Sequence, residues 1–98
     1  MSVPVILRRL AQAEFDDAAD WYDSRRSGRG AAFTAAVRQV LSAIGSQPET
    51  YPEVYGDVRE APVPGYPYAV YYRPLTGQVS VLAVFHTSRD PAEWQKRV

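Results

Sequence analysis

Four polar side chains in the second half of the sequence have the types needed to act on a phosphate-bearing substrate. They are Arg59, Arg73, His86 and Arg89. The first two could grip a phosphate, the histidine could serve as general acid or base, and the last arginine could stabilise developing negative charge. Such a set would suit metal-free cleavage of RNA through the 2′-hydroxyl. A second acid–base group is missing, and Tyr71 or Tyr72 could substitute for it.

Each of the four residues also has a structural interpretation, which the sequence leaves open. A single histidine at the end of a strand more often completes a turn through a hydrogen bond than it catalyses a reaction. Arg89 and Asp90 could together cap a C-terminal helix. The candidate ion-pair partners of Arg59 and Arg73 are Asp57, Glu60 and Asp90. Because Glu60 follows Arg59 directly on a predicted strand, its side chain should point to the opposite face of the sheet.

An apolar strand over residues 79–86 brings the only histidine to its C-terminal end. Strict alternation predicts that one face carries Val79, Val81, Ala83 and Phe85. The same rule places Leu82 and Val84 on the other face. A strand that is apolar on both faces is typical of the middle of a covered sheet.

The remaining pattern predicts the elements that position this strand. Predicted strands cover residues 3–7, 58–61, 68–73 and 79–86, and predicted helices cover residues 11–26 and 31–44. The glycine-rich residues 27–30 separate the helices, Gly45 is the expected C-cap of the second, and residues 46–56 read as an irregular link. Gly65 and Gly77 mark hairpin turns, and a short helix follows Asp90 and Pro91. Because Pro4 cannot donate to a ladder, the first strand is expected at a sheet edge.

This order predicts an α+β fold in one domain, residues 1–98. It has an N-terminal strand, an antiparallel helical hairpin, a three-stranded antiparallel meander and a short C-terminal helix. The place of the first strand in the sheet is left open.

Composition limits the possible functions. The chain of 98 residues has 11 basic and 11 acidic residues, and ten of the eleven cations are arginine. A net charge of zero argues against binding nucleic acid through bulk electrostatics. No cysteine and one histidine leave no transition-metal site, and no cofactor is expected. No apolar run approaches the ~20 residues of a membrane span, so a soluble cytoplasmic protein is expected.

Acidic residues are frequent in the first predicted helix. They are Glu14, Asp16, Asp17, Asp20 and Asp23. Their positions scatter around the helix, which favours a solvated face over a carboxylate metal site.

The apolar second face of the sheet predicts a protein partner. One helical hairpin covers one face, so the other is expected to remain partly exposed as a binding patch. The residues expected to contact a partner there are Tyr71, Leu82, Val84 and Trp94. The alternative is that Trp94 and the tyrosines close this face without help.

Two segments resemble the RelE/ParE superfamily of toxins from type II toxin–antitoxin modules. Residues 66–73 read Tyr-Pro-Tyr-Ala-Val-Tyr-Tyr-Arg, and residues 81–91 read Val-Leu-Ala-Val-Phe-His-Thr-Ser-Arg-Asp-Pro. The helical hairpin, Tyr51-Pro52 and Val58-Arg59-Glu60 extend the resemblance over nearly the whole chain. It implies a toxin that blocks growth until a cognate antitoxin wraps it, adding a helix or strand to apolar surface.

The superfamily contains two kinds of toxin. RelE-like members cut mRNA in the ribosomal A site, whereas ParE-like members poison DNA gyrase. This sequence has no lysine on its central strands, no tyrosine or second histidine near its C-terminus, and no net positive charge. These departures favour a ParE-like toxin, with a ribosome-dependent endoribonuclease as the alternative and an inactive antitoxin-binding scaffold as a third possibility. Nothing resembles a DNA-recognition helix, so specific DNA binding would belong to the antitoxin.

Overall fold

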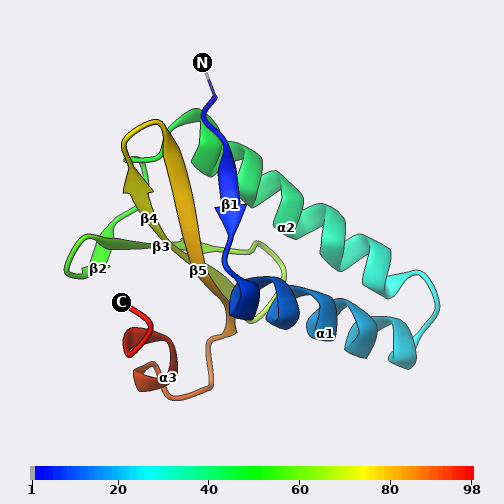
Figure 1. Cartoon of the computed structure of the whole chain (residues 1–98). Coiled ribbons are helices and arrows are strands. Elements are labelled where there is room, and N and C mark those ends of the chain that lie inside the picture. Colours follow the sequence, from blue (N-terminus) through cyan, green and yellow to red (C-terminus); the bar gives the residue numbers. More distant parts are fainter. Residues whose placement is uncertain (1) are drawn as a thin grey trace.

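A five-stranded sheet lies between a helical hairpin and a short C-terminal helix (Figure 1). The computed structural model describes residues 2–98; Met1, part of the predicted domain, lies outside the described residues. The strands are β1 (Val5–Leu7), β2 (Glu53–Tyr55), β3 (Val58–Pro62), β4 (Tyr68–Leu75) and β5 (Gln78–His86). The helices are α1 (Arg9–Arg25), α2 (Arg29–Ser46) and α3 (Ala92–Gln95). The predicted α+β class and element order are confirmed.

The first strand lies at an edge of the sheet, as Pro4 predicts. The strand order is β1-β5-β4-β3-β2, and β1 runs parallel to β5 while the other pairs are antiparallel. Val79 N–H donates to the carbonyl of Pro4 at 2.9 Å, and Arg8 N–H donates to the carbonyl of Val81 at 3.0 Å. Because β1 has only three residues, β5 has no neighbouring strand on that side beyond Val81.

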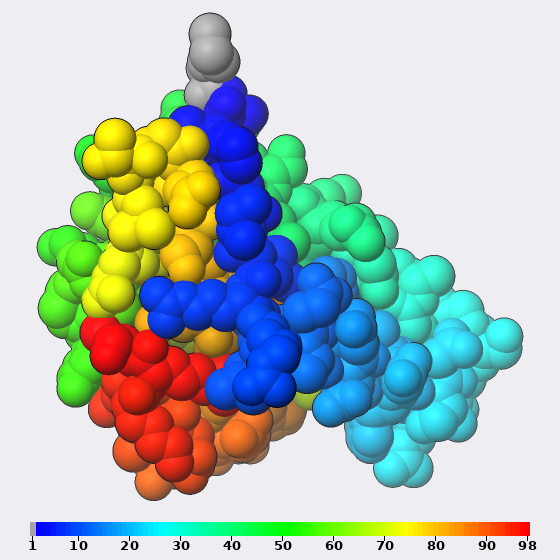
Figure 2. Space-filling view, in the orientation of Figure 1, coloured from blue at the N-terminus to red at the C-terminus, as the bar shows by residue number. Residues whose placement is uncertain are grey.

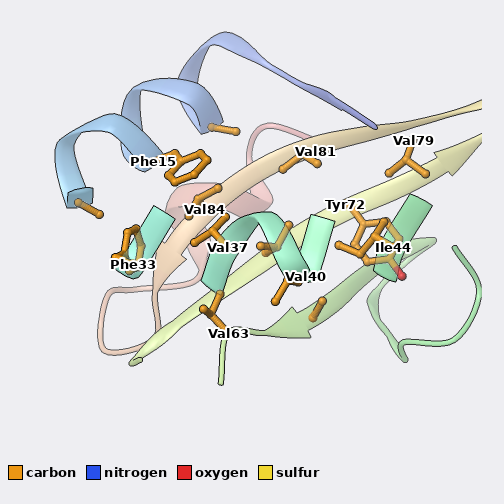
Figure 3. Close-up of a cluster of buried hydrophobic side chains, with 14 residues drawn as sticks. Phe15, Phe33, Val37, Val40, Ile44, Val63, Tyr72, Val79, Val81 and Val84 are labelled. Atoms are coloured by element: carbon orange, nitrogen blue, oxygen red, sulfur yellow. The ribbon is translucent and has the colours of Figure 1, made fainter. Parts of the chain in front are cut away.

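Alternation along β5 is interrupted by a bulge, so the predicted face assignment is wrong. Tyr71 pairs with Ala83 and Tyr72 with Val81, which leaves Leu82 as an extra residue. A bulge re-aims the side chains that follow it. The helix-side core therefore contains Val79, Val81 and Val84 (Figure 3), whereas the α3-side core contains Leu82, Ala83 and Phe85.

The second face of the sheet is sealed by the chain itself. Trp94 on α3 is 2% exposed, and its ring stacks on Tyr71 at 4.2 Å between centroids. Tyr55 meets the same indole edge-on at 5.7 Å. The expectation of an uncovered face is therefore wrong, and the alternative, closure by Trp94, is confirmed. A short helix is sufficient because one tryptophan covers a large area.

Most predicted boundaries shift by one to three residues, and three differences affect how the elements pack. Part of the expected irregular link forms β2, a short strand paired with β3. Helix α2 begins at Arg29, so only residues 26–28 separate the helices. Gly45 lies inside α2 and is not its C-cap: a Cβ there would lie 3.1 Å from both the carbonyl oxygen of Val3 and Val5 Cγ2. The glycine lets α2 approach the N-terminal segment closely.

No helix in the described part of the chain has the length and apolar character of a bilayer-spanning segment.

The turn between α1 and α2 depends on one carboxylate and two glycines. Asp23 Oδ1 accepts hydrogen bonds from the N–H groups of Gly28 at 3.0 Å and Gly30 at 3.2 Å. Gly28 has φ 91°, a left-handed conformation that favours glycine. A Cβ on Gly30 would lie 2.6 Å from the carbonyl oxygen of Ala19 and 2.9 Å from Asp23 Cβ. Gly30 thus sets how closely the helices cross.

We expect Gly30→Ala to destabilise the fold by about 1–3 kcal/mol because the added methyl group forces α1 and α2 apart. Helix propensity alone would make the same change stabilising by about 1 kcal/mol. Urea unfolding followed by circular dichroism measures the difference. Ala35→Gly, at an exposed position of α2, is the control and should cost only about 1 kcal/mol. A Gly30→Ala variant as stable as the original chain would contradict the close-packing argument.

Candidate functional site

A groove of about 850 Å³ lies between α1 and the C-terminal half of β5. We refer to it as the α1–β5 groove. Its walls come from α1, the start of α2, the beginning of β4 and the segment that follows β5. The lining residues are Glu14, Asp17, Ala18, Trp21, Tyr22, Arg25, Arg29, Pro67, Tyr68, Val84, His86 and Arg89.

Aromatic side chains form one wall of the groove and are fixed by the core. Tyr22 stacks on Phe33 at 5.0 Å, and Tyr68 meets Phe33 edge-on at 5.1 Å. Trp21 packs against Tyr22 at 5.1 Å but is 51% exposed. A large apolar ring held at a wet surface is typical of a protein-contact site.

Arginines form the rim beside Trp21. The guanidinium of Arg25 lies 4.7 Å from the centroid of the Trp21 ring. Neither Arg25 nor Arg29 forms an ion pair within residues 2–98. These two charges remain available to carboxylates of a partner, and arginine binds carboxylates with two parallel hydrogen bonds.

The floor of the groove includes the open edge of β5. Val84 N–H donates to Glu14 Oε1 at 3.2 Å, and the carbonyl of Leu82 accepts from Arg97 Nη1 at 3.0 Å. Side chains thus satisfy backbone groups that a neighbouring strand would otherwise bind. His86 lies two residues after Val84, so its peptide groups face the same edge.

Glu14 is the electrostatic centre of this edge. Its Oε2 lies 2.8 Å from Arg97 Nη2 and 3.4 Å from Arg89 Nη1, and its Oε1 lies 2.9 Å from Arg97 Nη1. Hydrogen bonding to Glu14 raises the pKa of Arg97 above its ordinary value. Glu14 and Arg97 form a bidentate, mostly buried ion pair between α1 and the residues that follow α3. Bidentate arginine–carboxylate pairs are among the strong ones.

The four candidate nuclease residues do not converge. Arg59 Nη1 donates to the carbonyls of Tyr51 at 2.6 Å and Glu49 at 3.1 Å, so Arg59 secures the link before β2. Its position pairs with Tyr72 on the α1–α2 side of the sheet, and Arg73, one residue on, faces the opposite side. Arg59 and Arg73 therefore face opposite sides of the sheet, and the expected clustering of the four residues is wrong.

The structural interpretations explain most of these residues. Arg73 Nε lies 2.8 Å from Asp57 Oδ1, one of the ion pairs considered in the sequence. His86 Nδ1 accepts from Ser88 N–H at 3.1 Å and lies 2.7 Å from Ser88 Oγ, so the histidine completes a turn. Asp90 Oδ1 accepts from Ala92 N–H at 3.0 Å and caps α3. Only His86 and Arg89 lie together, both in the α1–β5 groove.

Glu60 and Tyr71 form a pair on the other face. The Tyr71 hydroxyl donates to Glu60 Oε2, which places Glu60 opposite Arg59 as predicted. Burial and this carboxylate raise the pKa of Tyr71. Trp94 of α3 stacks on Tyr71, and both side chains are buried, so neither forms an open surface.

The predicted partner-contact residues have different surroundings. Val84 lines the α1–β5 groove, while Tyr71, Leu82 and Trp94 belong to the α3-side core. All four side chains are buried in the chain alone. The sequence pattern assigned no role to Trp21, although a tryptophan on a charged helix is a signal that could have identified it. The role of Glu14 depends on residues 70 and 83 positions away, which no local pattern reveals.

The acidic residues of α1 hold no common site. Asp23 secures the helical turn and Glu14 binds the C-terminal segment, while Asp16 accepts from Gln12 at 3.0 Å. Across residues 2–98, no group of three or more histidine, cysteine or acidic side chains has the arrangement of a metal site.

Comparison with known proteins defines the class of protein. The fold is similar to a solved chain from "Chromosomal ParDE TA system from P. aeruginosa", with a TM-score of 0.64. The likeness covers 87% of this chain and 96% of the solved chain at 15% sequence identity, so it shows a shared fold. A comparison with curated proteins finds no match.

The sequence itself identifies the family. Residues 5–91 match the family described as "ParE toxin of type II toxin-antitoxin system, parDE". Because the match spans most of the chain, the protein belongs to the ParE toxin family. The resemblance to the RelE/ParE superfamily, and its ParE-like side in particular, is confirmed.

Buried tyrosines predict a loss of stability at high pH. Burial raises the pKa of Tyr22, Tyr68, Tyr71 and Tyr72 above the ordinary value of 10.0. The folded chain therefore holds these phenol protons more tightly than the unfolded chain does. We expect the free energy of unfolding to be insensitive to these groups below pH 10 and to fall as the pH rises above 10.

Urea unfolding at pH 8 to 11.5, with phenolate absorbance at 295 nm, measures this decline. Tyr71→Phe should make it shallower, whereas Tyr55→Phe, at a position 44% exposed, serves as control. Equal slopes for the two variants would contradict the assignment to Tyr71.

Proposed function

We propose that this protein is a toxin that inhibits growth by poisoning DNA gyrase and is neutralised by a cognate antitoxin. Membership of the ParE family over residues 5–91 is the observation that carries the proposal. Gyrase as the target places the toxin in the cytoplasm. The toxin would act by binding and need no cofactor.

The scattered positions of the nuclease candidates support this target over mRNA. Arg59 donates hydrogen bonds to the link before β2. Arg73 lies on the opposite face, where it pairs with Asp57. The Nδ1 atom of His86 is occupied by Ser88. A general acid–base mechanism needs its groups within reach of one substrate, and only two of the four candidates, His86 and Arg89, share the α1–β5 groove. The ribosome-dependent nuclease is accordingly not favoured.

We further propose the α1–β5 groove as the antitoxin site. Trp21 offers an exposed aromatic anchor, and Arg25 and Arg29 offer unpaired positive charge for acidic side chains. The edge of β5 at Val84 offers backbone groups for an extended segment, as in recognition by strand addition. Contact with Leu82 would be through its carbonyl, while Tyr71 is covered by Trp94 of α3.

A two-target assay tests the mode of toxicity. Purified protein incubated with gyrase, ATP and plasmid should give linear DNA after denaturation of the enzyme, while primer extension should find translated mRNA intact. His86→Ala should retain full toxicity because His86 has no catalytic task in this proposal. His86-dependent cleavage of mRNA would contradict gyrase as the target. Unaffected growth on expression without antitoxin would instead favour the inactive scaffold.

A pair of exposed apolar residues on α1 tests the antitoxin site. Trp21 is 51% and Leu10 48% exposed, but only Trp21 lines the groove. Truncating a central tryptophan at an interface costs about 2 kcal/mol or more, which is about thirtyfold in affinity. We expect Trp21→Ala to weaken binding of the antitoxin encoded beside this gene by that factor, measured by calorimetry. Leu10→Ala should bind normally; equal losses would place the antitoxin elsewhere.

A further inference from the structure

Glu14 binds both the open edge of β5 and the residues that follow α3. Oε1 accepts from Val84 N–H on the open edge of β5, inside the α1–β5 groove. The same carboxylate holds Arg97, one residue before Val98, through both of its oxygens. Figure 2 shows the red C-terminal segment lying against the blue segment that leads into α1.

The C-terminal segment has few other attachments. Helix α3 has four residues, too few to be stable without tertiary contacts. Trp94 holds it by apolar packing alone, because its Nε1 has no hydrogen-bond partner in the described chain. Apart from Glu14, Arg97 reaches the carbonyl of Leu82 at 3.0 Å, and Arg8 Nη1 donates to the carbonyl of Arg97 at 3.1 Å. We call the Glu14–Arg97 ion pair the clasp, because it holds the residues after α3 against α1.

We propose that Glu14 couples occupation of the α1–β5 groove to release of α3. The proposal rests on the antitoxin site proposed above. A segment that pairs with the edge of β5 takes Val84 N–H and the carbonyl of Leu82, and so competes with both Glu14 and Arg97. Once Glu14 turns away, the clasp on Arg97 is broken. Helix α3 then opens more often and exposes Tyr71 and Phe85.

Through this coupling, neutralisation would affect both faces of the sheet. An antitoxin in the groove would change the opposite face of the sheet without touching it. Linkage requires the reverse as well: a chain whose clasp is already broken binds the same antitoxin more tightly.

Hydrogen exchange in the chain alone tests the clasp. In Glu14→Gln the amide oxygen can still accept from Val84 N–H, but the charge that holds Arg97 is gone. We expect the amides of Gln95 to Arg97 to exchange about tenfold faster, the effect of losing one charged hydrogen bond. Asp17→Asn is the control, because Asp17 lines the same groove without contacting α3. Equal rates in both variants, or an equal increase at the core amides of β5, would overturn the proposal.

The antitoxin complex tests the coupling. Binding should protect the amide of Val84 and accelerate exchange at residues 95–97, and Arg97→Gln should bind the antitoxin several-fold more tightly. Binding that protects Val84 while residues 95–97 exchange as before would overturn the coupling and leave the antitoxin site intact. Failure of the antitoxin to bind the unmodified chain would contradict the proposed function itself and remove the occupant on which the coupling depends.

Discussion

The structure depends on one strand that is buried on both faces. β5 pairs with β4 along its whole length and with β1 at its start, and two separate apolar cores meet across it. Leu82 is the extra residue that makes this possible, because it turns Val84 toward the helices and Ala83 toward α3. A chain of 98 residues has few elements with which to cover both sides of a sheet, so each side must be covered by few residues. The hairpin covers the larger side, and α3 covers the other through Trp94.

Much of this fold follows from the sequence. The helical periodicity, the apolar strands and the glycine turns predict every element except β2, and Gly28, Gly65 and Gly77 all have the positive φ expected of turn residues. The bulge at Leu82 could not be predicted, because register is decided by the partner strand and not by the strand itself. The same cause misled the placement of Arg59 and Arg73. Local pattern showed that both lie on strands but not that they face opposite sides.

The candidate site was harder to predict than the fold. His86 and Arg89 do lie in one groove, yet the residues that define this groove, Trp21 and Glu14, come from the first quarter of the chain. Glu14 is one of five acids on α1, and only tertiary contacts distinguish it from its solvated neighbours. The sealed second face reverses the reasoning that first suggested a partner. The surface left for a partner is an aromatic wall with arginines free of ion pairs and a strand edge that is bound by side chains in place of a neighbouring strand.

The parallel pairing of β1 with β5 has a consequence for biosynthesis. Val5 pairs with Val79, so the first strand cannot find its place until most of the chain has left the ribosome. Contacts this distant in sequence also slow the search for the native topology. A translation product that stops before residue 79 lacks the strand on which both cores are built. A product that stops there therefore cannot form the sheet that holds this fold together.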